Sequence, residues 1–183
     1  MKAWIYDDLP GDKREPHNQG DSASVNLSHL ESLGVSVKSG INENGMEKIA
    51  KESGFKYRDA SILSHEALPG KLFDKVLEDA YKEHMHEGEE IRYVYAGEAY
   101  WDVRDRPESR WVRIAASQGD LIELPIGIYH RFTLKKGVDF ADALALWKRP
   151  NKDSQLKTFY RDVGTDSGKV HKDYLQSISS AKR

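Results

Sequence analysis

The residues best suited to chemistry in this chain are three histidines and one glutamate, and they stand in two short motifs. His84, His86 and Glu90 belong to H-M-H-E-G-E-E-I-R-Y-V-Y-A-G, and His130 ends G-D-L-I-E-L-P-I-G-I-Y-H. Imidazole and carboxylate ligands suit Fe(II), Ni(II) or Mn(II), and the sequence has no cysteine that would favour a structural zinc site. The two motifs therefore predict a site for a divalent metal.

Strand geometry explains how these side chains can converge. Side chains alternate between the two faces of a strand, so His84 and His86 point the same way and Glu90 keeps their parity. His130 follows a proline and a glycine whose tight turn would aim the next strand at the same place. Three imidazoles and one carboxylate leave two positions of an octahedral coordination sphere open. The alternative is that the histidines only form hydrogen bonds in the core.

Changes in hydrophobic period predict the elements that hold the motifs. A capping box over Ser28–Glu31 opens a short helix that Gly34 ends, and longer helices are expected at 43–53 and 71–83. The last of these has an apolar stripe made of Leu72, Phe73, Val76, Leu77 and Ala80. After residue 84 the period becomes two, with strands at about 84–96, 99–104, 111–115, 120–124, 128–134 and 140–147. The tail from Asp166 onward is polar, and one or two helical turns are expected around Asp173–Ile178. The prediction is a mainly β sandwich or small barrel with peripheral N-terminal helices.

Composition excludes several classes of protein. The 183 residues suffice for one domain with a sizeable core. A net charge of −2 gives no electrostatic case for binding nucleic acid or an anionic membrane. The absence of a long apolar segment, of a secretory signal and of cysteine indicates a protein of the cytosol. Neither a G-x-G-x-x-G nor a P-loop motif is present, so no organic cofactor is expected.

The two motifs resemble the paired motifs of the cupin barrel, and further segments are similar to the acireductone dioxygenase family of methionine salvage. The segments that carry the second resemblance are E-E-I-R-Y (89–93), Y-W-D-V-R-D (100–105), W-V-R-I (111–114) and L-P-I-G-I-Y-H-R-F-T-L (124–134). The resemblance implies one double-stranded β-helix, or jelly-roll, domain over residues 1–183. Its parts would be an N-terminal loop and helical apron with outer strands (1–83), a metal-binding core (84–147) and a C-terminal extension (148–183).

The resemblance also implies a reaction. One Fe(II) or Ni(II) per chain would be held by His84, His86, Glu90 and His130, and the substrates would be O2 and acireductone, 1,2-dihydroxy-5-(methylthio)pent-1-en-3-one. The Fe(II) form would give formate and 4-methylthio-2-oxobutanoate, whereas the Ni(II) form would give formate, carbon monoxide and 3-methylthiopropanoate. Ligand type does not select strongly between the two metals, and Fe(II) is the expected physiological ion.

Arg92 and Phe132 are the candidate substrate-positioning residues. Arg92 has the parity of Glu90, so its guanidinium could orient an oxygen of an anionic enediol. Its alternative role is a salt bridge to Glu89 or Glu90. Phe132 shares a face with His130 and could form a wall against the thioether tail of the substrate, or it could be ordinary core.

Two other functions fit the same motifs. The chain could be a different metal-dependent cupin enzyme, either another dioxygenase or a sugar-phosphate isomerase, or a non-catalytic cupin that only binds a ligand. We expect a monomer in the cytoplasm, since nothing in the sequence demands a dimer, with no nucleic-acid or membrane partner. The family resemblance implies a nuclear location as well, which no basic cluster in the sequence decides. The sequence does not determine the metal loaded in the cell, the oligomeric state, or what the C-terminal extension contributes to the substrate pocket.

Overall fold

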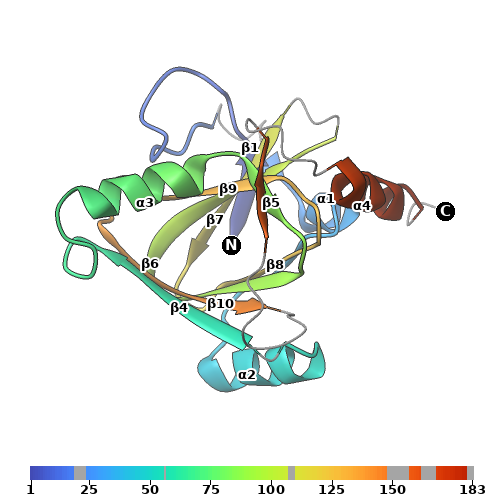
Figure 1. The fold of residues 1–183 in the computed structure, drawn as a ribbon, viewed down its shortest axis with the longest axis horizontal. Coiled ribbons are helices and arrows are strands. Elements are labelled where there is room, and N and C mark those ends of the chain that lie inside the picture. Colours follow the sequence, from blue (N-terminus) through green and yellow to red (C-terminus); the bar gives the residue numbers. More distant parts are fainter. Residues whose placement is uncertain (19–23, 56, 107–109, 148–156, 162–167, 181–183) are drawn as a thin grey trace.

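The computed structural model describes residues 1–18, 24–55, 57–106, 110–147, 157–161 and 168–180. Its strands are β1 (Lys2–Ile5), β2 (Ser24–Val25), β3 (Ser36–Lys38), β4 (Tyr57–Ser64), β5 (His84–His86), β6 (Glu90–Arg104), β7 (Trp111–Ser117), β8 (Leu121–Leu124), β9 (His130–Leu134), β10 (Phe140–Trp147) and β11 (Thr158–Tyr160). Its helices are α1 (Leu27–Ser32), α2 (Glu43–Glu52), α3 (Lys71–Tyr81) and α4 (Gly168–Ser180). The expected mainly β fold with peripheral helices is confirmed (Figure 1).

The long strand β6 joins the two halves of one antiparallel sheet. Its C-terminal half lies within the order β11-β5-β9-β6-β7-β1-β2, and its N-terminal half pairs with β8 and β10, beyond which lie β3 and β4. All the pairings among the described residues are antiparallel, and they form an open sheet rather than a closed barrel. In Figure 1 the strands surround the centre of the view, with α3, α2 and α4 around them. None of the described helices is long and apolar enough to cross a membrane.

A β-bulge at Tyr95 changes which side chains of β6 face the core. Against β10, Ala96 lies opposite Asp142 and Val94 lies opposite Ala143, so Tyr95 is an extra residue in β6. Before the bulge, Val94 belongs to the main apolar cluster, whereas Tyr93 packs in the cluster beneath α2. After the bulge, the odd-numbered residues Ala99, Trp101 and Val103 face the main cluster.

The two longer N-terminal helices are confirmed, but one side chain that was expected to be buried is exposed. Asn42 caps α2, because its side chain accepts a hydrogen bond from the Gly45 backbone. Helix α3 buries Phe73 and Leu77 and ends at Tyr81, two residues before the expected end. Leu72 is 48% exposed, which corrects its place in the apolar stripe. The face that includes Phe73, Val76, Leu77 and Ala80 lies about 100° away from Leu72 around the helix.

Four other predictions need correction. The strands expected at 84–96 and 99–104 are instead β5 and β6, and β6 runs through Gly97 without a break. Helix α1 begins earlier than expected, because Asn26 rather than Ser28 accepts the hydrogen bond from the His29 backbone. Helix α4 has 13 residues, where only one or two turns around Asp173–Ile178 were expected. Strand β9 starts at His130 rather than at residue 128, because the turn at residues 126–127 is followed by two residues that belong to no strand. The short strands β1, β2, β3 and β11 lack the apolar alternation that would have revealed them.

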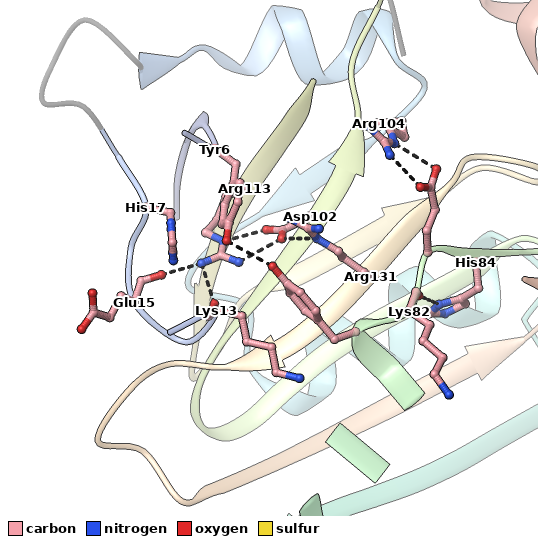
Figure 2. Close-up of polar contacts among 12 residues, drawn as sticks. Tyr6, Lys13, Glu15, His17, Lys82, His84, Asp102, Arg104, Arg113 and Arg131 are labelled. Carbon is pink, nitrogen blue, oxygen red and sulfur yellow. Dashed lines mark hydrogen bonds and ion pairs between the residues drawn. The ribbon is translucent and has the colours of Figure 1, made fainter. Parts of the chain in front are cut away.

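A buried ionic cluster on the outer face of the sheet fixes the N-terminal loop (Figure 2). The fully buried Arg113 forms two hydrogen bonds with Asp102, of 2.7 and 2.9 Å, and Arg131 donates a third to the same carboxylate at 2.8 Å. Arg113 also donates to the carbonyl oxygens of Lys13 and Glu15. This arrangement holds the N-terminal loop against β6, β7 and β9 on the face opposite His130.

Candidate metal centre

The three motif histidines lie together at the junction of β5 and β9. His84 pairs directly with His130 across the two strands, and His86 follows on the same face of β5. The ring centroids are 4.4 Å apart for His84 and His130, 5.1 Å for His84 and His86, and 5.2 Å for His86 and His130. One ligand nitrogen from each ring lies within 4.8 Å of the others. The predicted convergence of these histidines is therefore present.

The Nδ1 atom of each ring forms a hydrogen bond. Figure 2 draws the contact between His84 Nδ1 and the Lys82 carbonyl. These two atoms are 2.7 Å apart, and His130 Nδ1 is 3.1 Å from the Ile128 carbonyl. His86 Nδ1 is 3.1 Å from the Thr158 hydroxyl. A ring that donates its Nδ1 proton to a carbonyl keeps the lone pair on Nε2, which is the pattern of metal-binding histidines. His130 Nε2 is buried and makes no hydrogen bond.

Burial keeps the three imidazoles neutral. It lowers the pKa of His84, lowers the pKa of His86 to about 3, and lowers the pKa of His130 well below its usual value. The neighbouring His84 also contributes to the low pKa of both His86 and His130. A neutral imidazole is the form that binds a metal ion, so no proton has to be displaced at pH 7.

Glu90 adds a buried carboxylate at the first residue of β6. Its Oε1 lies 3.3 Å from His130 Nε2, and its Oε2 lies 2.7 Å from Arg92 Nη2. The side chain is only 1% exposed. The ligand atoms that lie within 4.8 Å of one another come from the three histidines, so Glu90 stays a predicted fourth ligand. Three neutral nitrogens and one carboxylate oxygen would suit Fe(II), Ni(II) and similar ions. The salt bridge to Glu90 that was the alternative role for Arg92 is also present.

A cavity of about 270 Å³ lies beside the histidines. Its walls come from β4, α3, β5, β6, β9 and β11, and they comprise Leu63, Val76, Asp79, Ala80, His84, His86, Arg92, Trp101, His130, Phe132, Thr158 and Tyr160. Arg92 and Phe132, the two candidate positioning residues, both line it, and Phe132 packs edge-on against Trp101 at 4.7 Å. A larger cavity of about 610 Å³ beside β1 and β2 has no histidine or carboxylate among its described lining residues.

Sequence reasoning missed several of these wall residues. Val76 and Ala80 were assigned only to the buried stripe of α3. Thr158 and Tyr160 stand outside both motifs, and no spacing in the sequence marks them. They reach the cavity because β11 pairs with β5, with Thr158 opposite His86 and Tyr160 opposite His84.

The other four histidines make contacts away from the cluster. His17 bonds to Asp7 at 2.8 Å, and His29 bonds to Asp105 at 2.7 Å. His65 packs on Phe73 at a centroid distance of 4.0 Å. His171 contacts the Gly127 carbonyl at 2.8 Å.

Comparison with known proteins now assigns the chain to a family. The model of the ARD/ARD' family matches residues 2–155. The chain belongs to the ARD/ARD' family. An acireductone dioxygenase of Aspergillus fumigatus is 38% identical to this family member over 180 residues, which cover 98% of each chain. Another, from Macaca mulatta, is 38% identical over 152 residues, covering 80% of this chain and 83% of the relative.

A solved structure shares the fold of this ARD/ARD' family member. It is the acireductone dioxygenase from Bacillus anthracis, which has a cadmium ion in its active centre. The TM-score is 0.60 at 17% sequence identity, and the match covers 81% of this chain and 93% of the other. The expected cupin fold is thereby confirmed.

Proposed function

We propose that this chain is an acireductone dioxygenase of methionine salvage, which cleaves 1,2-dihydroxy-5-(methylthio)pent-1-en-3-one with O2. The observation that carries the proposal is the cluster of His84, His86 and His130 in the wall of a cavity, in a chain of the ARD/ARD' family. The family supplies the reaction class, and the cluster supplies a site for the metal that the reaction requires.

The proposed ligands are His84, His86, Glu90 and His130, around one Fe(II) or Ni(II) per chain. The buried, hydrogen-bond-free Nε2 of His130 and the adjacent Glu90 carboxylate support this set. The bound ion would supply Lewis acidity that stabilises the enediolate and a template that orients its oxygens. We propose Fe(II) as the physiological metal, with 4-methylthio-2-oxobutanoate and formate as products. With Ni(II) the products would be 3-methylthiopropanoate, formate and carbon monoxide.

The chain's own side chains would bind and orient the substrate. The Arg92 guanidinium lines the cavity and is 2.7 Å from Glu90, so it can place positive charge beside an anionic oxygen without leaving its position. Phe132 and Trp101 form an apolar wall that would exclude water from the reacting carbons. The apolar Leu63, Val76 and Ala80 would contact the methylthio tail.

A sugar-phosphate isomerase is a weaker candidate for the same fold. Such an enzyme needs several basic residues that converge on a phosphate group. Arg92 is the one lysine or arginine among the described residues that line the cavity. We further propose that the protein acts as a monomer in the cytoplasm and nucleus, without a nucleic-acid partner.

Product analysis tests the proposal. Metal-free protein would be reloaded separately with Fe(II) and Ni(II) and then mixed with acireductone and O2. We expect formate and the keto acid from the Fe(II) form, and carbon monoxide from the Ni(II) form alone. A protein that binds one equivalent of either metal but consumes no acireductone would move the substrate to another cupin class.

A further inference from the structure

His86 differs from the other two histidines in the source of its hydrogen bond. The Nδ1 atoms of His84 and His130 contact carbonyls two residues earlier in their own segments, Lys82 and Ile128. His86 Nδ1 instead contacts the hydroxyl of Thr158, and His86 also bonds to the backbone of Lys157. The orientation of one ring of the cluster therefore depends on a segment far away in the sequence.

That segment, β11, is fixed to β5 next to the cluster. Thr158 pairs with His86 and Tyr160 pairs with His84 across the two strands. Just beyond the strand, the backbone N–H of Arg161 donates to the Glu83 carbonyl at 3.1 Å, and its guanidinium is 2.6 Å from the Glu83 carboxylate. Arg104 of β6 binds the same carboxylate at 2.6 and 2.9 Å. Glu83 thus links β11 to β6 immediately before His84.

Strand β11 also forms part of the cavity wall. Thr158 and Tyr160 both line it, and the Tyr160 ring lies 5.8 Å from the His84 ring. Docking of β11 therefore sets both the orientation of His86 and the shape of the cavity beside it. A strand that only completed the sheet would not need a side-chain hydrogen bond to a histidine of the cluster.

We infer that Thr158 is a positioning residue for the metal centre, and that β11 completes the site by holding His86 in the orientation that binds the ion. This inference rests on the proposed function. A hydroxyl that accepts the Nδ1 proton fixes the ring and raises the basicity of Nε2, as the partners of metal-binding histidines do. The ion pair of Arg161 with Glu83 keeps the hydroxyl in place.

The first test replaces the hydroxyl without changing the shape of the side chain. Thr158 is exposed, so Thr158→Val should fold normally, which circular dichroism would check. We expect its dissociation constant for Ni(II), measured by chelator competition on metal-free protein, to rise about tenfold. A tenfold rise is the lower end of the roughly 10- to 100-fold effect that loss of such a partner usually has. We expect the lower end because the Lys157 backbone still accepts a hydrogen bond from His86. Thr158→Ser keeps the hydroxyl and should bind within about twofold of the unsubstituted chain.

A spectroscopic measurement separates positioning from general destabilisation. The visible absorption of the Co(II)-loaded protein reports the arrangement of the ligands, so Thr158→Val should shift the bands and Thr158→Ser should restore them. Unchanged Ni(II) affinity in Thr158→Val, or a Thr158→Ser variant as weak as Thr158→Val, would overturn the inference. An unsubstituted chain that bound no Ni(II), or that bound it and left acireductone unchanged, would instead count against the proposed function.

The second test acts on the docking of β11 without touching His86. Arg161→Glu places a carboxylate beside Glu83 and should weaken Ni(II) binding in the same direction as Thr158→Val. Lys169→Glu is the matched control, because Lys169 forms an exposed ion pair with Asp173 on α4, at 2.8 Å. Equal Ni(II) affinity in the two variants would show that β11 docking does not support the metal centre.

Discussion

His84 faces His130 directly across the antiparallel pair of β5 and β9, and their ring centroids are 4.4 Å apart. This single pair joins the two sequence motifs. Each of the two rings is also tied through Nδ1 to a carbonyl of its own segment. Backbone pairing and local hydrogen bonds thus fix both rings before any ion binds, which reduces the entropy that binding must remove.

Removal of a cluster histidine should abolish metal binding and activity together. In His84→Ala and His86→Ala we expect the Ni(II) dissociation constant to rise by more than about 100-fold. Removing a metal ligand should weaken metal binding more than removing a hydrogen-bond partner of a ligand, which costs about 10- to 100-fold. Turnover of acireductone should fall to background. Calorimetric titration of the metal and product analysis would measure both. His65→Ala is the control, since His65 only packs on Phe73; retained turnover in His86→Ala would refute the ligand assignment.

Arg92→Ala should separate substrate binding from metal binding. Arg92 lines the cavity and pairs with Glu90, but it supplies no ligand atom to the proposed set. Loss of charge-assisted hydrogen bonds to the substrate should raise KM about 10- to 100-fold, which corresponds to roughly 1.5–3 kcal/mol. Steady-state kinetics and metal content would be measured side by side. Arg92→Lys keeps the charge but not the planar guanidinium group, so full rescue by lysine would show that positive charge alone accounts for the role of Arg92.

Gly127→Ala should destabilise the protein more than Gly137→Ala does. Both glycines have positive φ, 81° and 78°, so each substitution costs about 1–2 kcal/mol of backbone strain. A Cβ at Gly127 would also lie 2.7 Å from the Val170 carbonyl oxygen of α4, whereas a Cβ at Gly137 meets no described atom within 4 Å. Urea unfolding of the two variants would measure the difference. Equal stabilities would mean that α4 moves away at little cost.

Asp102→Asn should cost more stability than a comparable change at the surface. Asp102 is 1% exposed and binds both Arg113 and Arg131, so its replacement leaves the buried guanidinium of Arg113 and the partly buried one of Arg131 without their counter-charge. Breaking a buried pair in this way costs roughly 3–5 kcal/mol. Asp139→Asn is the control, because its carboxylate is exposed beside Arg14 and should contribute less than about 1 kcal/mol. Chemical unfolding of both variants would test this, and a small effect at Asp102 would contradict it.

The sequence by itself determined the chemistry and the local elements. The spacing of His84 and His86 put both on one face of a strand, since alternation is a property of the backbone alone. The spacing of apolar residues predicted α2 and α3, because the helical period of 3.6 residues is also a property of the backbone. The turn between Pro125 and Gly127 was also predictable, because proline and glycine restrict or permit backbone angles whatever surrounds them.

Only the tertiary structure decided which other side chains complete the site. Arg92 and Trp101 lie an odd number of positions apart on β6, so plain alternation would place them on opposite faces. The bulge at Tyr95 brings both to the cavity, and it arises from the pairing of β6 with β10. Thr158 reaches His86 only because β11 pairs with β5. Contacts between distant strands depend on the packing of the whole chain, and no local pattern encodes them.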